Sequence, residues 1–578
     1  MVYFKIFIDT KRRFFVKKKK GYIAFVLHSH LPYVLGHGTW PHGAEWLYEA
    51  AGETYIPLYR YFRKLKDEGI DAKITIGLTP VLSEQLVDER FKKGFVEYLN
   101  QKIESAKADE KYFERKKEDL LAKTARMWVD FYSNIKETFF HINHDIPGAF
   151  KKLQEEGAIE IITSGATHGY APLLSHDESV KGQVREGKKS YKRIYGKDPA
   201  GIWPPELAYR PGYTWKRPTD GKEYPRKGVE EIYFEEGIKY FLVDAHLLKG
   251  GKPIGTYLSL FEGLKILWER FKEQYKELEG KELSVYRPYF AISEGTKKPV
   301  AFFTRDPNTA LQVWSKDWGY PGDPAYLEFH KKHFPGGHRY WRITNPDGDL
   351  ATKEPYNPKN VEVPLSNQSD HFVGLVEKTI QEAGTENPVI VSPYDAELYG
   401  HWWFEGPRWL YLVLKKISAS EIAESITLSE YYEKYPPEIT VSLPEGSWGE
   451  GGFHWVWLNE WTEWTWKVIY ELEDRFFDLL EKTKRTELTE RLFKQAAREL
   501  LLLESSDWQF LITTWSARDY AEERVMEHAD YLKRTLDIIE NLRGDGLNRE
   551  DEEFVRDIED RDRLFPDIDP YEWKEEAK

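Results

Sequence analysis

Apolar residues recur along the chain in short continuous runs, and each run ends in polar residues. There are seven such runs: YIAFVLHSH from Tyr22, KITIGLTP from Lys73, AIEIITSGATHG from Ala158, GIWPPE from Gly201, KYFLVDAH from Lys239, PVAFFTRD from Pro299 and PVIVSPYDAE from Pro388. A run of this kind is typical of a strand that is covered on both faces, as in a parallel sheet. Because stretches with helical spacing separate the runs, the pattern predicts repeated β-then-α units and an α/β fold.

The polar residues always follow the apolar run rather than precede it. In a closed parallel barrel, the carboxyl ends of all strands open onto one face, where barrel enzymes keep their chemistry. We therefore expect one group of side chains to converge at that face: His28, His30, His168, Glu206, Asp244, His246, Arg305 and Asp395.

Two parts of the chain have helical spacing without strand-like runs. Residues 90–150 are charged and helical in pattern, which predicts a helical insertion over the barrel. No further strand with a polar end appears after about residue 427. We divide the chain into an N-terminal extension (1–20), a catalytic barrel (21–426) and a C-terminal helical domain (427–578). We expect the acidic tail after Gly544 to be frayed.

Composition narrows the classes of partner. The net charge of −14 at pH 7 argues against nucleic acids and acidic membrane surfaces. No window holds the roughly 18 uninterrupted apolar residues of a membrane span. The absence of cysteine excludes thiol nucleophiles and disulfides and indicates a reducing compartment, so we expect a cytoplasmic protein. Three methionines and 31% charged residues fit a heat-adapted protein.

Two carboxylates carry the predicted chemistry. Glu206 follows a strand between Trp203 and Tyr209, where a nucleophile or an acid can be held in one orientation. Asp395 is its natural partner. A separation of roughly 5 Å between two such carboxyls gives a retaining glycosidase, and a wider gap gives inversion. Glu397 competes with Asp395, because residues two apart in an extended segment share a face.

The chain is rich in aromatic residues, with 21 Trp and 36 Tyr. Such rings fill cores, and they also present flat faces to sugars. Trp448 stands in a glycine-rich loop, and we favour it as a sugar platform. If the segment after this loop is helical, Trp457, Trp461 and Trp464 fall on one stripe of the helix and pack the C-terminal domain onto the barrel. The loop that carries Tyr257 reads equally as a mobile lid and as an ordinary connection.

The histidines leave two readings open. His28, His30 and His168 could hold a metal, since neutral imidazoles suit zinc. The same side chains could bind sugar hydroxyls. The spacing alone favours neither.

Five motifs in sequence order resemble those of glycoside hydrolase family 57, and within it the α-1,4-glucan branching enzymes. They are HSHLPYV, SGATHGYAPLL, GIWPPELAYRPG, SPYDAELYGHWWFEGP and GSWGEGGFHWVWLNEWTEWTW. The resemblance runs from about Tyr22 to beyond Trp508. It implies an incomplete (β/α)7 barrel with a helical insertion and a C-terminal α-helical domain. It also implies that catalysis uses no metal or cofactor. Of the two interpretations of the histidines, the resemblance therefore favours substrate binding.

Carried over by this resemblance, Glu206 is the nucleophile and Asp395 the general acid/base. Tyr257 falls on the loop that shields the intermediate from water. Glucan-binding positions are expected at His28, His30, Trp40, His168, Asp244, His246, Tyr257, Arg305, Trp314, Gly322, Trp403, Trp448 and Asp507. Two features depart from the family pattern: Leu207 stands where cysteine is frequent, and the extension before Lys20 is additional.

We therefore predict a retaining 1,4-α-glucan branching enzyme that acts on amylose, amylopectin or glycogen. A 4-α-glucanotransferase or an α-amylase on the same scaffold is the nearest alternative. A metal-dependent, deacetylase-like hydrolase built on His28, His30 and Asp244 is a second. A non-catalytic glucan-binding protein is a third, disfavoured because both carboxylates are present. The oligomeric state is left open.

Overall fold

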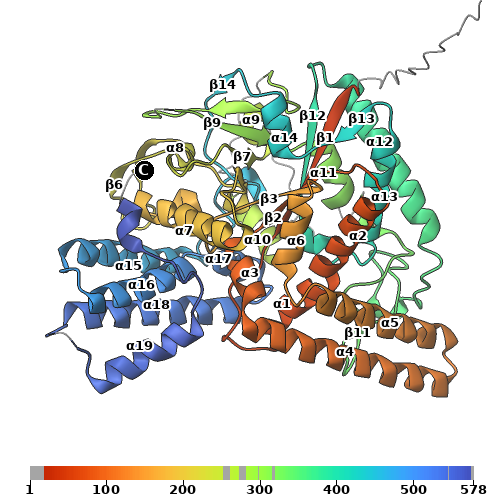
Figure 1. Ribbon diagram of the computed structural model, residues 1–578, viewed down its shortest axis with the longest axis horizontal. Helices are drawn as coiled ribbons and strands as arrows, with labels where there is room; N and C mark the ends of the chain where they lie inside the picture. The colour runs from red at the N-terminus through yellow and green to blue at the C-terminus, as the bar shows by residue number, and fades with distance from the viewer. Residues whose placement is uncertain are drawn as a thin grey trace, which may run out of the picture.

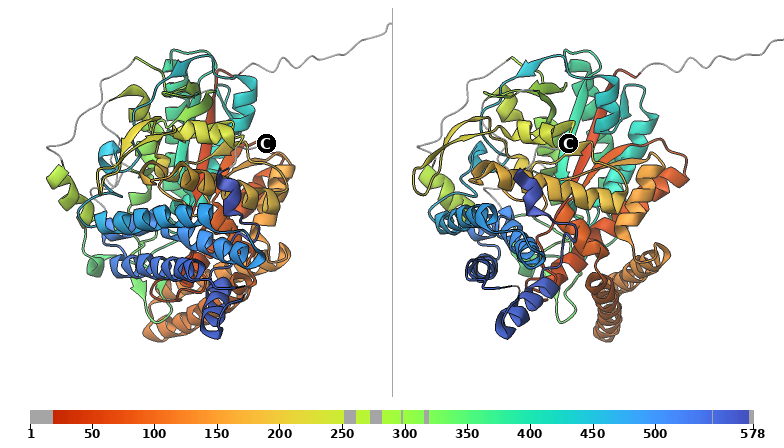
Figure 2. Two further views of the ribbon diagram at one scale, coloured as in Figure 1. Left: turned by 90° about the vertical axis from the view of Figure 1, so that its left-hand side faces the viewer. Right: turned by 60° about the vertical axis from the view of Figure 1, so that its left-hand side comes forward.

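The computed structural model describes residues 19–250, 261–271, 282–296, 298–314, 319–544 and 546–574. A β-rich body carries two helical parts, one coloured orange and one coloured blue (Figure 1). Both lie on the same side of that body in the turned views (Figure 2). None of the helices within these ranges is long and apolar enough to cross a membrane.

Seven parallel strands form the barrel. They are β1 (Gly21–Ser29), β2 (Ile74–Leu78), β3 (Ile159–Ile162), β4 (Gly201–Ile202), β7 (Tyr240–Val243), β9 (Val300–Thr304) and β12 (Val389–Asp395). Two partial sheets contain them, in the orders β12-β1-β2-β3 and β9-β7-β4. Single bridges, Thr163 with Ile202 and Arg305 with Val391, join the two sheets into a ring. These strands are the seven predicted runs, and the predicted fold class is confirmed.

The ring is least continuous at β4, which has two residues. Pro204 and Pro205 follow one residue later, after Trp203, and proline has no N–H to extend a sheet ladder. With seven strands in place of the eight of a complete (β/α)8 barrel, the barrel is an incomplete one.

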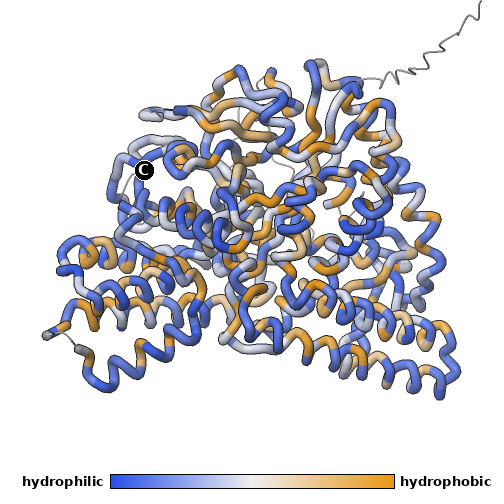
Figure 3. The backbone as a smooth tube through the Cα atoms, in the orientation of Figure 1, coloured by the Kyte–Doolittle hydropathy of each residue, from blue (hydrophilic) through white to orange (hydrophobic). Residues whose placement is uncertain are grey.

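Burial on both faces explains the apolar runs. All nine residues of β1 are buried, and hydrophobic residues mark the strands in Figure 3. The helices of the barrel are α2 (Ile56–Asp67), α3 (Pro80–Val87), α6 (Ile146–Glu155), α7 (Asp177–Tyr195), α8 (Val229–Glu235), α9 (Ala245–Lys249), α11 (Pro307–Trp314), α12 (Glu362–Glu382), α13 (Gly406–Ala419) and α14 (Leu428–Lys434). Buried tyrosines and leucines on their inner faces complete the core.

Additional segments surround the barrel. Short strands outside the ring are β5 (Tyr213–Lys216), β6 (Glu223–Arg226), β8 (Tyr289–Ala291), β10 (Lys332–His333), β11 (His338–Arg339), β13 (Ala423–Ser425) and β14 (Thr440–Val441). The remaining helices near the barrel are α1 (Ala44–Ala50), which continues through a π-turn into α2, and α10 (Glu262–Phe271).

The predicted helical insertion consists of α4 (Glu89–Lys116) and α5 (Asp119–His141). The Asp88 side chain caps α4 by accepting from the Arg90 N–H, and Lys117 ends the helix in the left-handed conformation. The two helices pack side by side.

The C-terminal helices are α15 (Glu463–Lys482), α16 (Glu487–Leu503), α17 (Ser506–Thr514), α18 (Arg518–Glu540) and α19 (Arg549–Arg561). Trp457 and Trp461 precede α15, so the predicted helical stripe through Trp464 is wrong, although Trp457 is buried as expected.

The acidic tail is folded from residue 546 to residue 574, and the prediction that it frays is wrong. Val555 and Ile558 bury the inner face of α19. Trp573 is buried against α7, where its indole N–H donates to Glu186. The charged residues of the tail cover its outer face, while these few apolar residues anchor it.

Candidate active site

Glu206 lies in the 3-10 turn Pro205–Leu207, which follows β4, and has a strained backbone conformation. Its φ is 60° and its ψ is 23°, in the left-handed region that residues other than glycine rarely adopt. The preceding Pro204 and Pro205 restrict the approach of the chain to this turn. The side chain remains 15% exposed, so it can reach a substrate. Strain of this kind is concentrated at functional sites.

Two donors hold the Glu206 carboxylate. The indole N–H of Trp448 donates to Oε2 at 2.9 Å, and the Ser506 hydroxyl donates to Oε1 at 3.3 Å. The backbone N–H of Trp448 also donates to the Glu206 carbonyl at 3.0 Å. These contacts fix the orientation of the carboxylate, as a nucleophile requires.

Trp448 is itself immobilised. Its ring makes an edge contact with Trp203 at 5.3 Å and lies 5.6 Å from the Arg305 guanidinium. Only 7% of the residue is exposed. Trp448 therefore orients Glu206, and it has little free ring surface to serve as the sugar platform that we predicted.

Asp395 ends β12 and pairs with His28 in the β1 ladder. No side chain in the described part of the chain donates a hydrogen bond to its carboxylate. Glu397 differs: its Oε1 accepts from the Tyr55 hydroxyl at 2.5 Å and from the His30 backbone N–H at 3.1 Å. The structure thus engages Glu397 in holding the loop and leaves the Asp395 carboxylate available.

The two carboxyls share an electrostatic environment. Burial, together with the nearby charges of Asp395 and Asp507, raises the pKa of Glu206 to about 7, against the lowering effect of the Trp448 hydrogen bond. Burial and the charge of Glu397 raise the pKa of Asp395 to about 7. Each group is poised near neutrality, as acid/base chemistry requires.

A hydrogen-bonded chain of histidines leads to Glu206. Because a carboxylate only accepts, Ser506 donates to Glu206 and must accept from Nδ1 of His168 at 2.9 Å. Nε2 of His168 then accepts from Nε2 of His28 at 3.0 Å. Burial, followed by the nearby His30, holds the pKa of His28 well below its ordinary value, so its ring is neutral. All donors in this chain point toward the carboxylate.

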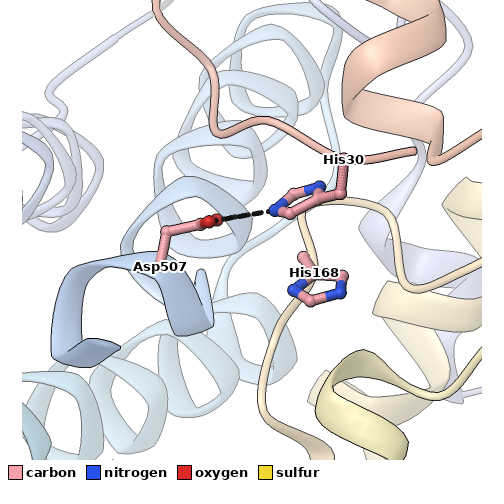
Figure 4. Close-up of side chains that lie close together, drawn as sticks. All are labelled: His30, His168 and Asp507. Carbon is pink, nitrogen blue, oxygen red and sulfur yellow. Dashed lines mark hydrogen bonds and ion pairs between the residues drawn. The ribbon is translucent and has the colours of Figure 1, made fainter. Parts of the chain in front are cut away.

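His30, His168 and Asp507 come together from the loop after β1, the loop after β3 and α17 (Figure 4). Nε2 of His30 donates to Asp507 at 2.9 Å, and Nδ1 lies 3.1 Å from the Thr79 hydroxyl. Burial alone would raise the pKa of Asp507, but His30 lowers it below its ordinary value. This hydrogen-bonded pair links the C-terminal domain to the barrel rim.

The same three residues are close enough to hold a cation, with their ligand atoms within 4.8 Å of one another. The rings of His30 and His168, however, stack at 3.9 Å with an interplanar angle of 18°. The lone pairs of stacked rings lie in parallel planes and do not converge on one point. Their nitrogens are also engaged in the hydrogen bonds above. The arrangement fits a hydrogen-bond network better than metal ligation.

Asp244 forms a second cluster with His246 and Arg305. Its Oδ1 lies 3.0 Å from Nδ1 of His246, and its Oδ2 accepts from Arg305 at 3.1 Å. Burial would raise the pKa of Asp244, but these partners lower it to about 2. Among the described residues, Asp244 is grouped with His246 and Arg305 and does not lie within ligand distance of both His28 and His30, the metal set of the deacetylase-like alternative.

The other predicted residues are placed differently. Trp403 is 2% exposed and packs against Tyr326, Tyr399 and Trp409, so its predicted contact with glucan is wrong. The adjacent Trp402 is 49% exposed and stacks on Phe329 at 4.3 Å. After the turn that follows β12, the ring of Trp402 faces solvent and the ring of Trp403 faces the core, the reverse of the prediction.

Four further predicted positions lie outside the carboxylate cluster or outside the described residues. Trp40 is 72% exposed. The ring of Trp314 makes an edge contact with Trp448 at 6.2 Å, and Gly322 ends a short 3-10 turn. Tyr257 lies outside the described residues.

Three residues that the sequence did not single out contribute to the site. Ser506 donates to Glu206, and Tyr55 holds Glu397. Trp203 stacks flat on His28, with ring centroids 4.5 Å apart. Only Trp203 carried a signal, since it belongs to the GIWPPE run. Ser506 and Tyr55 arrive from helices that lack any strand-end pattern.

The barrel and the carboxylate pair indicate a glycoside hydrolase as the class of protein. The chain belongs to glycosyl hydrolase family 57, whose model matches residues 24–444. A second model, described as the C-terminal part of 1,4-alpha-glucan branching enzymes, matches residues 468–573.

Individual relatives agree with these matches. The chain is 41% identical over 555 residues to 1,4-alpha-glucan branching enzyme TK1436 of Thermococcus kodakarensis. The aligned region covers 94% of this chain and 77% of that relative. The crystal structure of TK1436 in complex with glucose has a TM-score of 0.86 at 40% identity and covers 96% and 97% of the two chains. The branching enzyme of Pyrococcus horikoshii gives 0.84 at 38% identity and covers 97% and 98%. The alpha-amylase AmyC of Thermotoga maritima gives 0.79 at 29% identity and covers 96% and 100%.

Proposed function

We propose that this protein is a 1,4-α-glucan branching enzyme that works by double displacement through Glu206 and Asp395. The observation that carries the proposal is the asymmetry of the two carboxyls. Glu206 accepts hydrogen bonds from Trp448 and Ser506, whereas Asp395 accepts none from a described side chain. Hydrogen bonds to the charged form favour ionisation. Of two groups with a similar pKa, Glu206 is then the ionised nucleophile and Asp395 the protonated acid.

In the first step, the Glu206 carboxylate attacks the anomeric carbon of an α-1,4-linked glucose unit. The bond from that carbon to the leaving oxygen breaks, and Asp395 gives its proton to this oxygen. A glucosyl ester on Glu206 and a shortened glucan remain. The hydrogen bond from Trp448 holds the attacking oxygen in place.

In the second step, Asp395 takes the proton of a glucose 6-hydroxyl, and the resulting oxygen attacks the same anomeric carbon. The ester bond to Glu206 breaks and an α-1,6 linkage forms with retained configuration. Water would compete as the acceptor, so branching depends on its exclusion from the site.

The named relatives decide between the alternatives on this scaffold. The C-terminal match and the relatives with the highest identity reported above are branching enzymes. The amylase relative is less similar, at 29% identity. An amylase would give new reducing ends, and a glucanotransferase would give longer α-1,4 chains.

The test is to incubate the purified protein with amylose and to count α-1,6 linkages and reducing ends by proton NMR. We expect α-1,6 signals with few new reducing ends. Glu206→Gln and Asp395→Asn should each lose at least about a thousandfold of this activity. The exposed substitution Glu354→Gln serves as the matched control. Reducing ends without α-1,6 signals would overturn the branching assignment while leaving the two carboxylates in place.

Azide separates the two roles. Added to Glu206→Ala, azide can take the place of the missing nucleophile and give a β-glucosyl azide. Added to Asp395→Ala, it attacks the glucosyl ester and gives the α-anomer. The opposite pattern of anomers would exchange the two assignments.

A further inference from the structure

A groove of about 500 Å³ opens on the flank of the barrel, away from the carboxylate pair. Its walls come from α2, from the insertion helix α5, from the segment before α12 and from the start of α13 (Figure 1). Phe404 and Glu405, on one wall, belong to the loop that follows β12. The groove thus adjoins the loop that joins β12, which ends at Asp395, to α13.

The walls combine rings with polar groups. Half-buried Tyr61, Met127, Phe131 and Phe404 supply apolar surface, and Phe131 and Phe404 meet at 5.4 Å. The exposed Arg60 stands at the groove and forms no ion pair with a described residue. Aromatic surface beside a few hydrogen-bonding groups is the usual composition of a carbohydrate site.

One buried polar atom in the groove wall lacks a partner. Glu405 is 4% exposed, and its Oε1 accepts from the Tyr356 hydroxyl and the Leu327 N–H. Its Oε2 has no hydrogen-bond partner among the described residues. Burial raises the pKa of this carboxyl to about 7. An unsatisfied buried group is costly, and a ligand hydroxyl would satisfy it.

The charges favour a neutral ligand over an anion. Arg408 is paired with Glu362 and Lys64 with Glu68, so carboxylates offset both cations. Glu53, on another wall, is ionised beside Arg339. With Arg60 as the remaining cation and Glu405 near its midpoint of protonation, the groove matches a hydroxyl-rich, uncharged chain.

We propose that this groove is a second α-glucan-binding site, which holds a distant part of the polymer that reacts at Glu206 and Asp395. The inference rests on the proposed function for the identity of the ligand. A second contact on the same chain raises its effective concentration at the first site. The groove therefore favours long glucans over short ones.

The test uses the full chain carrying Glu206→Gln, so that glucan binds without turnover. Phe131→Ala should weaken the affinity for long amylose at least about fivefold in calorimetric titration. Phe140→Ala is the matched control, because Phe140 lies on the same helix α5, is 48% exposed and does not line the groove. Arg60→Ala, at an exposed position, should weaken binding in the same direction.

Hydrogen–deuterium exchange locates the bound chain. Amylose should protect residues 127–135 of α5 as well as the loop that carries Trp448. Protection of the Trp448 loop alone, with Phe131→Ala equal to Phe140→Ala, would overturn the second site. Since these measurements need no turnover, a failure to form α-1,6 linkages would refute the proposed function without deciding the fate of the groove.

Discussion

At the scale of single residues, Trp448 orients the Glu206 carboxylate, a role that the sequence did not predict. Its indole N–H makes the shorter of the two hydrogen bonds to this carboxylate, at 2.9 Å against 3.3 Å for Ser506. We predict that Trp448→Phe lowers kcat about 10- to 100-fold, the range for one hydrogen bond of about 1.5–3 kcal/mol to a charged group. Loss of the bond also raises the pKa of Glu206, so the acidic limb of the pH–rate profile should move to higher pH.

The matched control for this prediction is Trp464→Phe, on the partly exposed surface of α15. It should leave both kcat and the acidic limb unchanged. A Trp448→Phe enzyme with a higher KM and an unaltered pH profile would show that Trp448 contacts sugar and does not orient Glu206.

At the scale of elements, continuous apolar runs predicted the barrel strands because burial on both faces leaves a local signal. β1 shows this most clearly, with nine buried residues in sequence. The short strands β8 and β14 carried no such signal. They exist because distant segments meet, as Phe290 pairs with Thr440. No local pattern encodes a pairing across 149 intervening residues.

The sequence likewise predicted those residues of the candidate site that local pattern places, and missed those that depend on packing between distant segments. Glu206 and Asp395 follow or end barrel strands, and barrel enzymes keep their catalytic residues at the carboxyl ends of the strands. Trp403 was misplaced because the turn after β12 decides which neighbouring ring is buried, and Trp402 is the exposed one. Ser506 could not be found, since its position depends on how α17 docks against the β3 loop.

The docking of the tail on α7 gives a prediction for a helix contact. A Cβ placed on Gly182 would lie 2.8–3.0 Å from the ring of Trp573. Gly182→Ala should therefore destabilise the protein by about 1–3 kcal/mol through overpacking, despite the better helix propensity of alanine. Gly374 in α12 has no atom within 4 Å of such a Cβ. Gly374→Ala should instead stabilise by up to about 1 kcal/mol.

Chemical denaturation at constant pH measures both changes. Trp573 fluorescence is masked by the other tryptophans, so far-UV circular dichroism is the better signal. Equal effects of the two alanines would mean that the tail can move away from α7 without cost.

At the scale of the whole molecule, two sets of carboxyls give stability opposite dependences on pH. Burial raises the pKa of one set to about 7: Glu186, Glu206, Asp395, Glu397, Glu405 and Glu450. Partners lower the pKa of a second set to about 2: Asp88, Asp244, Glu328 and Glu527. A raised folded pKa means that the folded state holds the proton more tightly than the unfolded state does, and a lowered one means the reverse.

The two sets therefore change the free energy of unfolding in opposite directions as pH rises. Stability from the first set is complete below the unfolded pKa of about 4 and is lost as pH rises toward 7. Stability from the second set is present above that value and is lost as pH falls toward 2. We predict a maximum in the free energy of unfolding near about pH 4, with a decline as pH falls toward 2 and a second decline as pH rises toward 7.

Glu186 isolates the alkaline limb, because it is buried beneath Trp573 and away from the carboxylate pair. Burial raises its pKa from 4.5 to about 7, which corresponds to about 3 kcal/mol of stability lost between pH 5 and 9. Glu186→Gln cannot titrate, so its free energy of unfolding should fall by about that much less over this range than the wild type's. Urea unfolding at pH 5, 7 and 9 and constant ionic strength measures the difference, with exposed Glu354→Gln as control. Parallel curves for wild type and Glu186→Gln would mean that the Glu186 carboxylate ionises in the folded protein without cost, through the nearby Lys189 ammonium.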